Sequence, residues 1–132
     1  MTYLLDTNVC IKYLNGQSDE IVKKISSFSP DDIVICSVVR AELFAGDYKS
    51  KSFKKTYDKL INFLNVFPSI PFDDEASDIF GDIRAQLEKK GKPIGPFDLQ
   101  IASIALLNDL ILVTHNTKEF SRIIKLEIED WE

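Results

Sequence analysis

The sequence contains few of the residues that build zinc sites or disulfide frameworks. Among its 132 residues there are two cysteines, Cys10 and Cys36, and one histidine. The cysteines lie in apolar surroundings and lack the close spacing of metal ligands, so we expect two buried free thiols. With no cluster of histidine or cysteine, a zinc centre is not expected.

Long apolar runs are also missing. No segment approaches the ~20 apolar residues that a membrane helix needs. The N-terminus, MTYLLDTNV, carries an acid at position 6 and no basic region, unlike a secretory signal. There is no internal repeat, linker or low-complexity segment, and we expect a cytoplasmic protein that does not engage a membrane.

Basic residues are outnumbered, with 16 lysines and arginines against 21 acids and a net charge of −5. This balance argues against a protein that coats nucleic acid, although an enzyme with a local basic surface remains compatible with it. The composition, 45% hydrophobic and 28% charged, is that of a folded globular chain. Its length suits one domain, which we place over residues 1–132.

Short apolar strands alternate with amphipathic helices along the chain. The predicted strands are residues 2–6, 32–36, 69–72, 110–114 and 125–130. The predicted helices are residues 8–14, 19–28, 37–47, 53–64, 74–91 and the stretch that follows Pro96, with Ser37 as the N-cap of the third. The alternation predicts an α/β fold, with a central parallel sheet of four to five strands covered by helices on both faces.

Ligands of such folds bind at the carboxyl ends of the strands, and polar residues gather there. Asp6 and Thr7 follow the first strand, Glu42 lies one helical turn beyond the second, and Asp98 heads the helix that leads into the fourth. After the fourth strand come the residues Thr114, His115, Asn116 and Glu119. We therefore expect the site at this edge of the sheet.

Each acid also has a simpler explanation. Asp6 is well placed to cap the following helix, and Asp98 to interact with a helix dipole three residues after the turn at Gly95-Pro96. Glu42 is harder to explain structurally, because the residues three and four positions away on its helical face are apolar or small. A lone carboxylate on a packed face is costly unless it is paired or bound to a metal.

The acids Asp6, Glu42 and Asp98, with a possible fourth in Glu119, would repel one another if they converged. A hard divalent cation relieves that repulsion, and oxygen ligands suit Mg²⁺ or Mn²⁺. Such sites commonly serve phosphoryl chemistry, in which a metal activates water and neutralises charge on the phosphate.

Five segments together resemble the PIN-domain ribonucleases, and more closely the VapC toxins of type II toxin–antitoxin pairs. They are LLDTNVCI (4–11), SVVRAELFAG (37–46), GKPIGPFDLQIA (91–102), VTHNTKEF (113–120) and EDW (129–131). The likeness runs along the whole chain. It implies a single PIN domain, metal-binding acids at Asp6, Glu42 and Asp98, a catalytic role for Glu119, and supporting roles for Thr7, Thr114 and Asn116.

One position departs from many relatives, which carry an acid where this chain has Asn116. Asn116 can still hold a metal-bound water through its amide, while Glu119 supplies charge. The number of metal ions therefore stays open.

The resemblance also implies partners. VapC toxins form homodimers and are silenced by a VapB antitoxin, in higher hetero-oligomers, through an antitoxin segment that covers the acidic site. The subgroup with these motifs resembles endonucleases that cut the anticodon stem-loop of initiator tRNA. Candidate RNA-binding residues are Lys51, Lys54, Lys55 and Lys92, although a solvated helix face explains such lysines equally well.

Two alternatives remain at this stage. The strand-Asp-Thr-Asn pattern is also similar to haloacid-dehalogenase phosphatases, with Asp6 as nucleophile, but those enzymes need a second acid where this chain has Asn8. The other alternative is a non-catalytic binding module with a PIN-like fold. Retained acids argue against it, since buried carboxylates without a metal only destabilise.

Overall fold

Five short strands form one sheet: β1 (Tyr3–Leu5), β2 (Ile33–Cys36), β3 (Ser69–Ile70), β4 (Ile111–Val113) and β5 (Ile128–Glu129). Their order is β3-β2-β1-β4-β5, and every neighbouring pair is parallel. The computed structural model describes all residues from 1 to 132. It confirms the predicted α/β fold and all five predicted strands, each of which is shorter than the range predicted for it.

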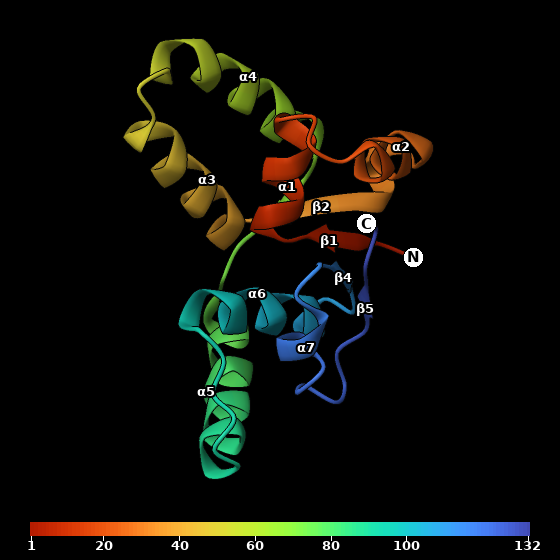
Figure 1. Ribbon diagram of the computed structural model, residues 1–132. Helices are drawn as coiled ribbons and strands as arrows, with labels where there is room; N and C mark the ends of the chain where they lie inside the picture. The colour runs from red at the N-terminus through yellow and green to blue at the C-terminus, as the bar shows by residue number, and fades with distance from the viewer.

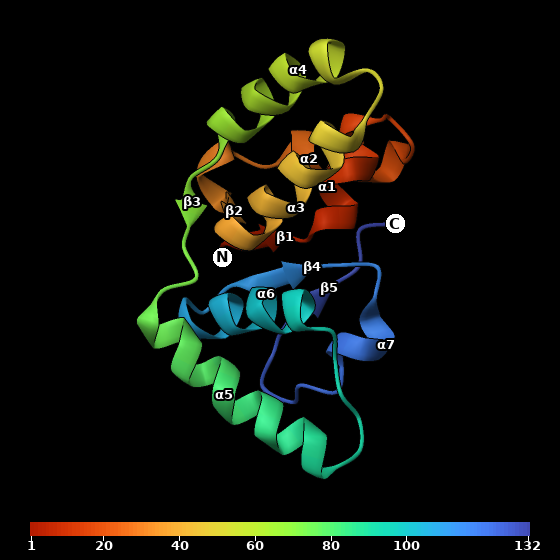
Figure 2. The same cartoon turned by 90° about the vertical axis from the view of Figure 1, so that its left-hand side faces the viewer.

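Helices cover both faces of the sheet, as predicted. On one face lie α1 (Thr7–Leu14), α2 (Asp19–Ser27), α3 (Ser37–Lys49) and α4 (Phe53–Val66). On the other lie α5 (Asp74–Lys89), α6 (Pro96–Leu107) and α7 (Thr117–Phe120), as Figure 1 and Figure 2 show. A 3-10 turn that was not predicted, Pro30–Asp32, precedes β2. None of these helices has the length and apolar character needed to cross a membrane.

The core is continuous from the sheet into α6. Every residue of β1, β2 and β4 is buried, because parallel strands are covered on both faces. In α6 the residues from Ile101 to Ala105 are all fully buried. Both cysteines are free and buried, as predicted. Burial raises the pKa of the Cys36 thiol to about 11 and that of Cys10 well above its usual value, so neither is a reactive thiolate at neutral pH.

The sheet changes direction of winding between β1 and β4. The chain passes from β1 to β2 and then to β3 on one side, and returns to β4 on the other side of β1. The ends of β1 and β4 are joined where the amide of Asp6 donates to the carbonyl of Val113 at 3.1 Å. Such a switch point leaves the strand ends accessible between diverging helices, which is where α/β folds bind ligands.

The predicted N-cap role of Ser37 is wrong. Strand β2 runs directly into α3, so Cys36 occupies the cap position and Ser37 is already the first helical residue. The Ser37 hydroxyl instead accepts a hydrogen bond from the Phe72 amide at 3.0 Å. This bond ties the start of α3 to the segment that follows β3.

Candidate functional site

Asp6 lies at the carboxyl end of β1 and is only 6% exposed. It does cap α1: its Oδ1 accepts from the Val9 amide at 2.9 Å. Burial raises its pKa, and the nearby Glu42 charge adds to that rise, against the hydrogen bonds from Thr114 and Val9. The capping prediction is thus confirmed, yet the cap leaves Asp6 as a carboxylate whose charge is poorly compensated.

Glu42 reaches the same region from α3. It is half-buried, and its Oε1 accepts a hydrogen bond from the Thr7 hydroxyl, the first side chain of α1, at 2.7 Å. Arg40 points elsewhere and lies over the Phe44 ring, 5.8 Å from its centroid. Glu42 therefore forms no ion pair with Arg40 of its own helix.

Asp98 is the third residue of α6, which begins at Pro96 as predicted. It is half-buried, with Leu99, Ile101 and Ala102 packed beside it in the core. Burial, followed by the charges of Asp6, Glu42 and Glu119, raises the pKa of Asp98 to about 6. The four predicted acids therefore lie close enough to repel one another.

Thr114, Asn116 and Glu119 form a connected unit after β4. Thr114 is fully buried, and its hydroxyl accepts from the Asn116 amide at 3.0 Å. The Asn116 side chain in turn donates to Glu119 Oε2 at 3.2 Å across the first turn of α7. Asn116 thus fixes the direction of the Glu119 carboxylate.

None of these four acids is in an ion pair, since the salt bridges of the chain all lie elsewhere. They are also not packed as tightly as three direct ligands of one ion. The group whose ligand atoms all lie within 4.8 Å of one another is His115, Asp130 and Glu132. All four acids offer oxygen ligands, which suit Mg²⁺, an ion that keeps several of its waters and is reached by some carboxylates only through them.

The His115 cluster is satisfied by internal pairing. His115 Nδ1 lies 3.0 Å from both Asp130 Oδ2 and Glu132 Oε2, and Glu132 also pairs with Lys12. The imidazole is 62% exposed. Its partners tie the C-terminal residues to the strand edge that holds the acids.

Two cavities flank the acids. One, of about 320 Å³, lies between α1, α3 and α4, with Ile11, Leu14, Leu43 and Leu60 as its apolar surface and Glu42 in its wall. The other acid in its wall, Asp47, was not predicted from the sequence. Asp47 Oδ1 accepts from the Thr56 hydroxyl at 2.6 Å, whereas its Oδ2 is buried without a hydrogen-bond partner. The signal was available, because Asp47 follows the apolar Leu43 by four residues on one helical face.

The other cavity, of about 360 Å³ and more open, lies beside Asn116. Its lining residues are Asn8, Ile11, Lys12, Gln17, His115 and Asn116. Of these, only Asn116 was assigned a role from sequence. Single polar residues at loop and helix ends carry no periodic signal, so only the fold could bring them together.

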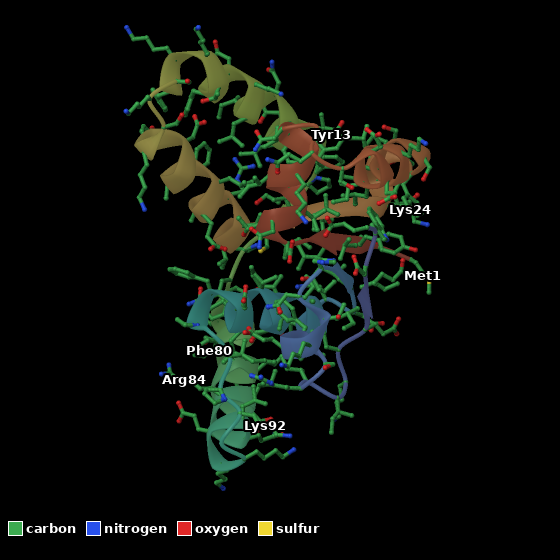
Figure 3. The ribbon with its side chains drawn as sticks, in the orientation of Figure 1. Met1, Tyr13, Lys24, Phe80, Arg84 and Lys92 are labelled. Carbon is green, nitrogen blue, oxygen red and sulfur yellow. The ribbon has the colours of Figure 1, made fainter.

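The candidate RNA-binding lysines fall on two surfaces. Lys51, Lys54 and Lys55 are exposed at the tip of the arm formed by α3 and α4. Lys92 lies beside the far end of α5, at the opposite end of the molecule (Figure 3). The four lysines therefore do not lie together on one contact surface.

The sequence matches the family model of the PIN domain over residues 3–126. Ribonuclease VapC2 of Rickettsia felis is 39% identical to this chain, with 100% of this chain and 99% of the relative covered. The tRNA(fMet)-specific endonuclease VapC of Shigella flexneri is 34% identical, with 99% and 98% covered.

Similarity in structure is equally extensive. The crystal structure of VapBC2 from Rickettsia felis, bound to a DNA fragment from their promoter, contains a chain that aligns with a TM-score of 0.93. That chain is 38% identical, and the alignment covers 100% of both chains. The likeness therefore includes every element that carries the acids.

Proposed function

Because this chain belongs to the PIN-domain family, and within it to the VapC ribonucleases, we propose that it is a toxin endoribonuclease whose acids hold a divalent metal ion. Asp6, Glu42 and Asp98 are the proposed metal-binding residues, and Glu119 is a further proposed catalytic residue beside them. Mg²⁺ is the expected ion and Mn²⁺ a substitute. The phosphatase alternative is not retained, since the family match is to the PIN domain.

The observation that carries the metal proposal is the uncompensated charge of the acids. Asp6 and Asp98 both have raised pKa values, and no basic side chain forms an ion pair with either or with Glu42 and Glu119. Carboxylates brought together in this way are stabilised by a hard cation. All the candidate donors are oxygen atoms, which favours magnesium over zinc.

The protein's own groups hold the acids in place. Thr7 donates to Glu42, the Val9 amide donates to Asp6, and Asn116 donates to Glu119. Each bond fixes the orientation of its acid. A bound Mg²⁺ supplies an activated water and neutralises charge on the phosphate. Asp98, at the head of α6, lies close enough to Asp6 and Glu42 for their charges to act on it, and we propose that it binds the same ion.

The direct test is RNA cleavage by the purified full-length chain under defined metal conditions. EDTA should stop cleavage, and Mg²⁺ or Mn²⁺ should restore it. Ca²⁺ should restore it poorly, because the larger ion tolerates loose geometry and acidifies water less. Asp98→Asn should be inactive, while Asp78→Asn, an exposed acid of α5, serves as the matched control. Full activity in EDTA, with contaminating nucleases excluded, would overturn the metal proposal.

A VapB-type antitoxin is the expected partner, by likeness to the VapBC structures. The 320 Å³ cavity supports this expectation, because it combines an apolar surface with the unpartnered Asp47 Oδ2 and opens next to Glu42. An apolar side chain followed by a basic one would fit it, and would cover Glu42. Such binding would stop RNA from reaching the acids.

Three finer points are proposals that rest on the same family likeness. The substrate is expected to be a structured RNA, with initiator tRNA as the first to test. The chain is expected to pair with a second copy of itself and to join the antitoxin in a larger assembly. Lys51, Lys54 and Lys55, none of them in an ion pair, are available for phosphate contacts at the arm.

A further inference from the structure

The open cavity of about 360 Å³ lies at the switch point of the sheet, beside the acids. Its residues come from α1, from the turn after α1, and from the segment that follows β4. Figure 1 shows α1 leaving the end of β1 on one face while α7 follows β4 on the other. The cavity therefore occupies the accessible edge between the two helical layers.

The turn after α1 explains how Gln17 reaches this cavity. Helix α1 is capped at Asn15, and Gly16 adopts a φ of +62°, a conformation that residues with a side chain rarely adopt. The Gln17 amide then donates to the carbonyl of Lys12 at 3.0 Å, a bond typical of a glycine-terminated helix. This turn folds the chain back, so that Gln17 and Lys12 line the same space.

The lining is made almost entirely of hydrogen-bonding groups. Asn8, Gln17 and Asn116 each offer a carboxamide, which both donates and accepts. Asn8 and Gln17 are exposed. The ring of His115 presents Nε2 as its unengaged nitrogen, since Nδ1 faces Asp130 and Glu132. Ile11, 37% exposed, supplies the one apolar surface.

The cavity is connected directly to the acids. Asn116 lines it and also donates to Glu119, while Asn8 lies two residues beyond Asp6 at the start of α1. A group bound in the cavity therefore lies next to the proposed reaction centre. It is a different kind of pocket from the one beside Glu42, where the lining offers four leucine or isoleucine side chains.

We propose that this cavity binds one unpaired nucleobase of the RNA next to the phosphodiester that is cut, with Asn8 and Gln17 reading the base edge. The proposal rests on the proposed ribonuclease function. Sequence-specific RNA recognition relies on unstacked bases held through their edges by hydrogen bonds. Carboxamides complement these edges because they present a donor and an acceptor side by side, and Ile11 can cover the face of the base.

The test combines protein variants with altered RNA. Asn8→Ala and Gln17→Ala, with Gln86→Ala on α5 as a matched control, are assayed as full-length protein on a substrate that the wild type cuts. Each nucleotide within three positions of the cut is replaced in turn by another base or by an abasic residue. The wild type should lose roughly 5–100-fold in kcat/KM when the critical base is removed.

In Asn8→Ala and Gln17→Ala, removing the same base should lower kcat/KM little further. The protein variant and the abasic residue each remove the same interaction, so their effects should not add. The loss should appear mainly in KM. Both replaced side chains are exposed, so the melting temperature should stay near that of the wild type. The control Gln86→Ala should keep the full wild-type base preference.

Additive losses at every position tested would overturn the proposal. So would an unchanged base preference in Asn8→Ala and Gln17→Ala, combined with weaker binding of the antitoxin, because the cavity would then serve the protein partner. A wild-type chain that cuts no RNA in Mg²⁺ or Mn²⁺ would instead contradict the proposed function itself. The experiment therefore separates the two failures.

Discussion

At the scale of single residues, Asp6 and Asp98 carry an electrostatic penalty in the folded chain. Burial is the largest cause of the raised pKa in both, and charge repulsion adds to it. A group whose pKa is raised on folding binds protons more tightly in the folded state than in the unfolded chain. For an acid, this means that the ionised form destabilises the fold.

The first prediction follows for Asp98, whose folded pKa is about 6 against an unfolded value near 4. In EDTA, the free energy of unfolding should fall as the pH rises from about 4 to about 7, while Asp98 ionises in the folded state. Asp98→Asn should lessen this fall and stabilise the metal-free chain at pH 7 by about 1–2 kcal/mol, allowing for solvent screening. Urea unfolding of both proteins across this pH range measures it; a variant less stable than wild type at pH 7 would contradict the repulsion argument.

A second residue-scale prediction concerns Glu119, which Asn116 orients by a single hydrogen bond. We expect Glu119 to act through a water, so Glu119→Gln should lower kcat by roughly 10–100-fold. Asp6→Asn should lower it much further, because it removes a proposed direct ligand. Both variants are assayed on the same RNA across a Mg²⁺ titration. Equal inactivity at saturating Mg²⁺ would mean that Glu119 contacts the metal directly or acts as the base.

At the scale of elements, α1 and α3 are linked inside the site by one side-chain bond. Thr7 opens α1 and its hydroxyl donates to Glu42 in the middle section of α3. The two helices also enclose the apolar cavity, with Ile11 on α1 and Leu43 on α3. The position of Glu42 thus depends on how α1 packs against α3, as well as on its own helix.

The third prediction tests this link. Thr7→Val keeps the shape and removes the donor, so Glu42 should lose its orientation, and both kcat and Mg²⁺ affinity should fall by roughly 10-fold or more. Thr7→Ser keeps the hydroxyl and should retain most of the activity. Cleavage rates over a Mg²⁺ series separate the two variants. Equal activity of Thr7→Val and Thr7→Ser would show that the Thr7–Glu42 bond has no part in catalysis.

For the whole molecule, the switch point between β1 and β4 gathers one acid from the end of β1 and three from helices α3, α6 and α7. Asp6, Glu42, Asp98 and Glu119 reach it from sequence positions far apart, and nothing local holds them together. The site therefore exists only in the folded chain. A ligand that neutralises it should stabilise the fold as a whole, because the unfolded chain cannot present it.

The fourth prediction is that Mg²⁺ raises the melting temperature of the wild-type chain in a concentration-dependent manner, following its binding curve. Asp98→Asn should show a much smaller rise, and Asp78→Asn a rise like that of the wild type. Differential scanning calorimetry with Mg²⁺ against a matched concentration of Na⁺ measures the effect. If Asp98→Asn and wild type respond equally, Mg²⁺ binds elsewhere on the chain.

The sequence by itself determined the order of elements and pointed to the acids that we propose carry the chemistry. Alternating apolar strands and amphipathic helices predict the parallel sheet, because burial on both faces demands continuous apolar strands. Asp6, Glu42 and Asp98 stood out since each charge lies among apolar neighbours. The N-cap of α3 is Cys36 and was predicted one residue too late, because β2 runs directly into α3 with no polar residue between them, and the Ser37 hydroxyl instead accepts from the distant Phe72 amide.

Only the tertiary structure decided how far apart the acids lie and what surrounds them. The Thr56–Asp47 bond, the Thr7–Glu42 bond and the cavity shared by Asn8, Gln17 and Asn116 all join segments that the sequence keeps apart. Periodicity reports which face of an element is buried, but carries no information on which faces meet. Which faces pack together is set by the order of the strands in the sheet. Because β1 lies between β2 and β4, side chains from both halves of the chain lie close together at the end of β1.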